Sequence, residues 1–231
     1  MRLTARHDAK EIIRELESKS DPRGIEGMKR FGIDTDDALG ISVVELRLMA
    51  RKIGRSHDIA LALWSSGIHE ARILASIVED KDKITERQMD EWANDFNSWD
   101  ICDQCCSTFS YTKYAHRKAM QWSKSKKEFV KRAGYAMMAA IAVHDKGASD
   151  ADLARFLPVI KAGATDDRNY VKKSVNWALR QIGKRSRRLN RLSIKTAKEI
   201  RNMDSRSARW IASDAIRELA GKQVQGRLNG N

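Results

Sequence analysis

Proline, glycine and long apolar runs are scarce in this sequence, and each shortage excludes a class of structure. Only 2 prolines and 13 glycines occur among 231 residues, which is too few turn residues for the many short strands of a sandwich or barrel. No apolar run approaches the roughly 20 residues that a membrane-spanning helix needs. The amino terminus also lacks the apolar core of a secretory signal. We therefore expect a cytoplasmic protein that does not associate with membranes.

Cysteine is sparse as well, because the three thiols at Cys102, Cys105 and Cys106 are the whole supply. An odd number so close together does not form a disulfide framework, which fits a reducing compartment. With His116 the thiols could assemble four zinc ligands, but structural zinc sites draw on two separated pairs. One continuous helix favours small buried side chains instead. We expect no metal and no other cofactor.

Positive charge, in contrast, is in excess. Lys and Arg number 44 against 31 Asp and Glu, for a net charge of +13, and the isoelectric point is near 9.8. This excess suits a polyanionic partner, with nucleic acid as the leading candidate. The alternative is a generally basic surface without a specific partner, so the placement of the charges must decide.

Helical periodicity runs through almost the whole chain. Apolar residues recur three and four positions apart, as in Leu46, Met49, Ala50 and Ile53, and strict alternation is absent, so we expect an all-α protein. The Gly-rich segment 21–42 interrupts the pattern and is expected to be a turn and short linker. Helices are expected at residues 4–19, 42–54, 57–66, 69–79, 85–95, 98–109, 111–122, 126–143, 149–162, 168–183, 187–201 and 205–220.

Parts of the chain repeat. The segment "FVKRAGYAMMAAI" (129–141) aligns with "YVKKSVNWALRQI" (170–182) at an offset of 41, and "ALRQI" (178–182) aligns with "AIREL" (215–219) at an offset of 37. Helix-pair repeats of the HEAT type have periods of roughly 40–47 residues. A chance match between amphipathic helices is the alternative, although the basic residues shared before the apolar stripe speak against it.

This repetition predicts one domain, a curved α-solenoid of antiparallel helix pairs with its binding surface on the concave side. We expect an N-terminal helix and linker over residues 1–40, the helical repeats over 41–221 and a flexible tail over 222–231.

The helix expected at 168–183 carries cations and an indole on one face. Lys173, Trp177, Arg180 and Lys184 are spaced i, i+4, i+7 and i+11, so they lie on the same side. Trp177 could instead fill a groove between neighbouring helices. Further cations precede and follow at repeat spacing, and such a row suits a phosphate backbone. The apolar residues that pack the helix lie opposite, at Val171, Val175, Leu179 and Ile182.

The stretch "SWDICD" (98–103) places Trp99 four residues before Asp103. On a helix the two side chains stand over one another. In a basic groove, such a carboxylate could stabilise the oxocarbenium-like sugar cation that forms when a base leaves its deoxyribose. The indole face attracts cations by about 0.5–2 kcal/mol. The alternative role for Asp103 is a helix-surface carboxylate in an ion pair.

Together these motifs resemble the DNA alkylation repair family of HEAT-like-repeat alkylpurine DNA glycosylases, the AlkD-like enzymes. The similarity covers about residues 40 to 220, and its motifs occur in the family's order. They are "HEARILAS" (69–76), "SWDICD" (98–103), "FVKRAGYA" (129–136) and "VKKSVNWALRQIGKR" (171–185).

The resemblance implies excision of N3- and N7-alkylated purines from double-stranded DNA, by hydrolysis of the N-glycosidic bond without a metal. Asp103 would be the catalytic carboxylate, with Trp99 and Trp177 as aromatic walls against the lesion nucleotide. We expect a monomer. The rival is a non-catalytic HEAT-repeat module that binds nucleic acid or scaffolds proteins. The expected DNA-binding residues are Arg132, Arg180, Lys172 and Lys173 from the resemblance, and Lys184 and Arg185 from the charge pattern.

Overall fold

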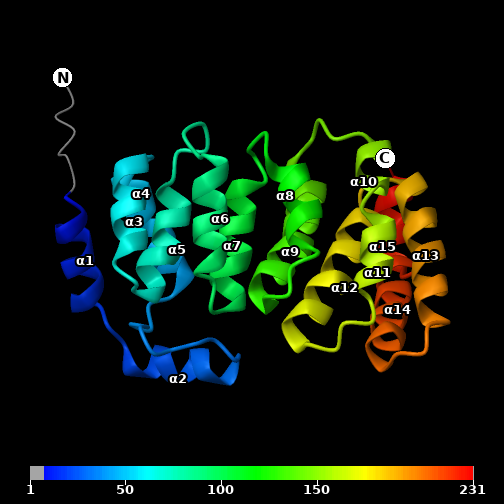
Figure 1. The fold of residues 1–231 in the computed structure, drawn as a ribbon, viewed down its shortest axis with the longest axis horizontal. Coiled ribbons are helices and arrows are strands. Elements are labelled where there is room, and N and C mark those ends of the chain that lie inside the picture. The colour runs from blue at the N-terminus through cyan, green and yellow to red at the C-terminus, as the bar shows by residue number, and fades with distance from the viewer. Residues whose placement is uncertain (1–7, 231) are drawn as a thin grey trace.

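The computed structural model describes residues 8–230, and this part of the chain folds entirely into helices, turns and loops (Figure 1). The all-α prediction is therefore confirmed. None of the helices in the described part is long and apolar enough to cross a membrane. In chain order the helices are α1 (Ala9–Ser18), α2 (Pro22–Arg30), α3 (Val43–Ile53), α4 (His57–Ser65), α5 (His69–Val78), α6 (Glu86–Asn94), α7 (Trp99–Phe109), α8 (Ala115–Trp122), α9 (Glu128–His144), α10 (Asp150–Ala154), α11 (Leu157–Gly163), α12 (Asn169–Gly183), α13 (Arg187–Arg201), α14 (Arg206–Leu219) and α15 (Lys222–Asn229).

Short polar side chains set many of these helix starts. A side-chain oxygen just before the helix accepts a hydrogen bond from an amide of the first turn, which satisfies a donor that has no partner inside the helix. Thr85 and Ser149 form reciprocal capping boxes with Gln88 and Asp152. The other residues that cap in this way are Asp8, Asp21, Ser42, Ser56, Ser186 and Ser205.

The helices stack as pairs along one axis. We call α3, α5, α7, α9, α12 and α14 the inner layer, because each contacts the next in that order, while α4, α8 and α13 pack behind α5, α9 and the α12–α14 pair (Figure 1). The repeated segments fall on α9, α12 and α14, three inner-layer neighbours. The HEAT-like solenoid expected from the sequence offsets is thus confirmed.

Helix α9 lies at the centre of the stack and is buried nearly all round. A helix enclosed on every side needs apolar or small residues on every face, and "AGYAMMAAIA" (133–142) supplies them. At Gly134 an added Cβ would lie 2.3 Å from the backbone nitrogen of Ser123. The glycine therefore lets α8 and α9 approach backbone to backbone.

The segment after α1 differs from the linker expected at residues 21–42. Residues Pro22–Arg30 form α2, because Asp21 caps the helix and Pro22 supplies the fixed φ that suits a first helical position. These start signals outweigh the low helix propensity of Gly24 and Gly27. The first four residues of the helix expected at 4–19 lie outside the described residues.

Two later expectations also need correction. The helix expected at 149–162 is divided into α10 and α11, where Pro158 lacks the N–H that would continue the ladder. The tail expected at 222–231 is helical over Lys222–Asn229, because Val224 and Leu228 are buried against Leu219.

Residues 31–42, which we call the strap, cross the N-terminal ends of α12, α7 and α5. The Tyr170 hydroxyl donates to the Gly32 carbonyl at 2.6 Å, and the Trp99 indole Nε1 donates to the Phe31 carbonyl at 3.1 Å. Further along, the His69 amide donates to the Asp37 carbonyl at 3.0 Å. One short segment therefore touches helices that are far apart in sequence.

The far end of the strap is fixed by one buried carboxylate. Glu70 is fully buried and accepts hydrogen bonds from the amides of Leu39 at 2.8 Å, Gly40 at 2.7 Å and Ile41 at 3.2 Å. At Gly40 φ is +83°, and an added Cβ would lie 2.1 Å from the carbonyl oxygen of Asp21. This position needs glycine for both conformation and space.

Candidate active site and nucleic-acid interface

Asp103 on α7 and Arg132 on α9 form a two-point ion pair. Arg132 Nε donates to one carboxylate oxygen at 2.9 Å, and Nη2 donates to the other at 2.7 Å. The side chain of Asp103 is 21% exposed, while that of Arg132 is only 6% exposed. The carboxylate is therefore held in a fixed plane but stays reachable from solvent.

Trp99 stands at the first position of α7, one turn before Asp103. Its ring lies beside the same guanidinium, with the ring centroid 5.9 Å from Arg132 Cζ. The hydrogen bond from its indole nitrogen to the strap carbonyl of Phe31 fixes the ring orientation. The sequence expectation that Trp99 and Asp103 share one face is confirmed.

Arg132 departs from its expected role as a phosphate-binding cation. Its remaining terminal nitrogen, Nη1, donates to the backbone carbonyl of Tyr170 at 2.8 Å, and the residue is buried. All three guanidinium nitrogens thus have protein partners. The side chain links α7, α9 and α12, and in this structure it serves the carboxylate of Asp103 rather than an exposed phosphate site.

Burial and the ion pair act in opposite directions on the carboxylate. Burial holds the pKa of Asp103 above its usual value, although the charge and hydrogen bonds of Arg132 lower it. Desolvation disfavours the charged form, and a nearby cation favours it. Arg132 is therefore the group that favours the anion of Asp103, which is the form able to stabilise a developing positive charge.

A second carboxylate, Asp100, belongs to a different network. It accepts from His69 Nε2 at 2.8 Å and from the Ser98 hydroxyl. Burial alone raises the pKa of Asp100, but these hydrogen bonds outweigh burial and bring the pKa below its usual value. His69 is 3% exposed, so the pair anchors the start of α7 to α5.

Two of the cations expected on this face, Arg180 and Lys184, are engaged with carboxylates of α14. Arg180 pairs with Glu218 and lies 3.7 Å from Asp214, and Lys184 donates to Glu218 at 2.6 Å. The expectation that both residues bind DNA stays a prediction. The partners come from tertiary packing, because α14 lies beside α12 and brings Asp214 and Glu218 within reach of these cations.

The other residues expected to bind DNA have varied surroundings. Lys172 Nζ lies 5.3 Å from the ring centroid of Trp210, and Arg185 donates to the carbonyls of Asp145 and Lys146. Lys173 is exposed and has no ion pair with any residue in the range 8–230. Trp177 is partly buried against the core.

The three thiols pack inside the protein. Cys102, Cys105 and Cys106 are all fully buried, and burial raises the pKa of each thiol. Cys102 and Cys106 point toward the carbonyls of Phe129 and Ala133. The expectation of small buried side chains is confirmed. Within the described part, no three His, Cys, Asp or Glu residues are grouped to hold a metal ion.

Sequence reasoning missed three residues that build the site. Tyr170 joins Arg132 to the strap, Glu70 holds the strap, and His69 holds Asp100. The motif "HEA" (69–71) contains two of them. A His and a Glu on a largely apolar helix were the available signal, because charged residues are rarely buried without a partner.

The fold and the site together define a helical-repeat solenoid with an arginine-held carboxylate beside an indole on its inner layer. The chain belongs to the DNA alkylation repair enzyme family, whose model matches residues 12–219. No curated protein has a sequence that matches this chain.

One solved structure resembles this protein with a TM-score of 0.76 and 20% sequence identity, and the match covers 91% of this chain and 95% of the other. That protein is described as one of a new family related to the HEAT-like repeat DNA glycosylases, with affinity for branched DNA structures. At this level of identity the similarity supports the shared fold alone.

Proposed function

We propose that the protein is a monofunctional alkylpurine DNA glycosylase, a hydrolase that removes N3- and N7-alkylated purines from duplex DNA and acts as a monomer. The observation that carries the proposal is the Asp103 carboxylate, which is partly exposed, lies one helical turn from Trp99 and is held in plane by Arg132. Membership of the DNA alkylation repair enzyme family supports it.

The protein need not protonate the leaving base, because an N3- or N7-alkylated purine already carries positive charge. When the C1′–N bond breaks, its electron pair leaves with the base and neutralises that charge. Positive charge then develops on the sugar, where the Asp103 carboxylate stabilises it. A water molecule forms the new bond to C1′ and gives up its proton to the carboxylate or to solvent. A group that acts on the developing charge lowers the barrier.

In this proposal Arg132 is a positioning residue. Its two hydrogen bonds fix the plane of the carboxylate and favour its ionised form. Trp99 and Trp177 form aromatic walls for the sugar and backbone of the damaged nucleotide. The exposed Lys173 is a phosphate contact, because a free cation can release counterions from DNA.

Release of methylated purines from alkylated duplex DNA tests the proposal directly. We expect the purified protein to release 3-methyladenine and 7-methylguanine, and we expect Asp103→Asn to lose nearly all of this release. Asp58→Asn is the matched control, since Asp58 is an exposed carboxylate on α4. Absence of release by the unaltered protein, or equal release by Asp103→Asn, would contradict the proposal.

A non-catalytic DNA-binding module is the second candidate, and one observation favours it. Both oxygens of Asp103 already accept hydrogen bonds from Arg132, as they would in a purely structural pair. This reading predicts that Asp103→Asn binds undamaged and alkylated duplexes equally and that neither protein releases bases. The release assay, run beside a binding titration, separates the two functions.

A further inference from the structure

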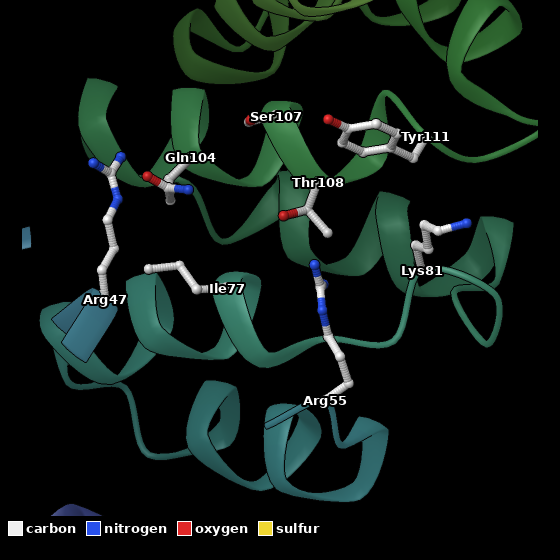
Figure 2. A pocket seen from close by; sticks show the side chains of 8 residues that line it. All are labelled: Arg47, Arg55, Ile77, Lys81, Gln104, Ser107, Thr108 and Tyr111. Carbon is white, nitrogen blue, oxygen red and sulfur yellow. The ribbon is translucent and has the colours of Figure 1, made fainter. Parts of the chain in front are cut away.

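A hollow of about 310 Å³ lies between α3, α5 and α7, apart from the Asp103 site. Figure 2 shows Arg47 and Arg55 on one side, Gln104, Thr108 and Tyr111 on the other, and Ile77 between them. A second hollow of about 410 Å³ shares Arg47, Arg55 and Ile77 and extends toward Arg51. Single ligand sites span about 300–1,000 Å³, and each hollow falls within this range. The two share three lining residues, and we call them together the channel.

The lining of this channel is positive and contains no acidic side chain. Its cations are Arg47, Arg51, Arg55 and Lys81. Arg47 and Arg51 have no ion pair with any residue of the described part. Arg55 Nη1 donates to the carbonyl of Glu79 at 2.6 Å, which orients its other nitrogens without neutralising the charge.

This arrangement is the reverse of the α12 face and the Asp103 site. There, Arg132, Arg180 and Lys184 are each neutralised by a carboxylate. A cation that already has a carboxylate partner offers less to a phosphate than a free one does, because the partner must first be displaced. Three cations of this channel, Arg47, Arg51 and Arg55, have no carboxylate partner among residues 8–230, whereas Lys81 pairs with Asp82 at 3.1 Å.

One wall of the channel adds an aromatic platform. Tyr111 is 53% exposed although it is a large ring, and its centroid lies 5.5 Å from that of the His144 ring. Burial, followed by the charge of Lys146, lowers the pKa of His144, so this imidazole is neutral near pH 7 and supports Tyr111 as a second flat ring. Gln104, whose amide has no partner in residues 8–230, faces the same space.

Sites for single-stranded nucleic acid combine two components, a row of cations and an exposed aromatic ring. The backbone follows the cations while a base stacks on the ring. We propose that the channel binds one unpaired nucleotide of a nucleic-acid strand, with its phosphate at Arg47, Arg51 and Arg55 and its base on Tyr111. Part of the site is formed by Gln104, Ser107 and Thr108 of α7, the helix that also carries Asp103. The proposal holds whether or not the protein excises bases.

Fluorescence anisotropy with undamaged DNA tests this site. The probes are a blunt duplex and the same duplex with a three-nucleotide single-stranded extension. We expect the extension to tighten binding at least about fivefold, which is the lower end of the effect of stacking one base on an aromatic ring. Tyr111→Ala should abolish this gain, and Tyr111→Phe should keep it. An extension made of abasic residues should lose the stacking gain.

The charged part of the site has its own matched pair of variants. Arg47→Gln should weaken binding. It should also reduce the slope of log affinity against log salt concentration by about 0.9, the value for one phosphate contact. Arg87→Gln removes the same charge from the exposed α6 surface, where Arg87 pairs with Glu91, and should leave both values unchanged. Equal effects of the two variants would overturn the proposal.

Two further results would also overturn it. One is equal affinity for the blunt and extended duplexes, or a gain that survives Tyr111→Ala. The other is displacement of the extended duplex by adenosine monophosphate at micromolar concentration, which would make the channel a mononucleotide site. Because no lesion is present, these outcomes do not depend on base excision.

Discussion

The guanidinium of Arg132 meets the carboxylate of Asp103 edge to edge, so each oxygen receives one hydrogen bond. Two parallel bonds fix orientation as well as distance, which a lysine could not do. Each carboxylate oxygen keeps a second lone pair. The pairing therefore leaves the exposed edge of Asp103 able to face a substrate.

Removing the arginine should affect both stability and pH dependence. Arg132→Gln leaves a largely buried carboxylate without its cation, so we expect a loss of about 3–5 kcal/mol in the free energy of unfolding. Burial then acts without the opposing cation and raises the pKa of Asp103 further. Because activity needs the anion, the acid limb of the excision rate should move to higher pH. Guanidinium unfolding and a pH–rate profile measure the two effects.

Arg132→Lys is the companion variant, because it keeps the positive charge but cannot donate the two parallel hydrogen bonds to Asp103. We expect its acid limb to lie closer to that of the unaltered protein, with a lower rate at every pH. An acid limb that stays in place in Arg132→Gln would show that a group other than Asp103 sets it.

Asp166 should make stability depend on pH in the acid range. Hydrogen bonds from Arg168, reinforced by Lys131 at 2.8 Å, bring the pKa of Asp166 far below its usual value. A carboxyl with a lowered pKa in the folded state stabilises the fold above its unfolded pKa of about 3.9, and this stabilisation is lost as pH falls below it. Asp166→Asn should therefore lower the melting temperature at pH 6 and have progressively less effect below about pH 4. A constant difference would show that the loss is steric.

The buried Glu70 should control the strap. Glu70→Ala leaves the amides of Leu39, Gly40 and Ile41 without their acceptor, and we expect a loss of about 3 kcal/mol in stability. Glu70→Gln keeps one acceptor oxygen and should lose less. Glu91→Ala, on the exposed face of α6, is the control. Hydrogen exchange should show faster exchange at residues 39–41 in Glu70→Ala, and unchanged exchange there would contradict the assignment.

The thiols should be unreactive in the folded protein. Burial raises the pKa of Cys102, Cys105 and Cys106, and the thiolate is the form that reacts. A disulfide reagent at pH 8 should label none of them until denaturant is added, and then all three. We also expect Cys105→Ser and Cys106→Ser to retain activity, and metal analysis to find no stoichiometric zinc. Rapid native labelling, or zinc lost with these thiols, would contradict this prediction.

The features predicted from the sequence are those set by local spacing. The 3.6-residue period located most helices, and the alignment of 129–141 with 170–182 identified α9 and α12 as stacked equivalents. Trp99 and Asp103 lie one turn apart on a single helix, so their shared face followed from spacing alone.

The features that were missed depend on partners distant in sequence. Arg132 and Asp103 are 29 residues apart, and nothing in either segment shows that the arginine forks onto the carboxylate rather than facing a phosphate. Likewise, Arg180 looks free on α12 until α14 supplies Glu218. Helix α2 was missed because its two glycines favoured a linker over a helix, although Asp21 and Pro22 are a helix-start signal. The sequence shows where the cations lie along the chain, but only tertiary packing shows which of them are paired with a carboxylate.

The strap changes how the whole stack should fold. In an ordinary solenoid each repeat contacts only its neighbours, so folding can begin anywhere and unfolding can proceed from either end. Here the bond from Tyr170 to Gly32 joins positions 138 residues apart, which raises the contact order and slows folding. The same bond couples the stability of the N-terminal repeats to that of the central repeats. The part of this repeat protein from α1 to α12 should therefore unfold as cooperatively as a globular domain. Among the described helices, only those after α12 should be able to unfold independently of it.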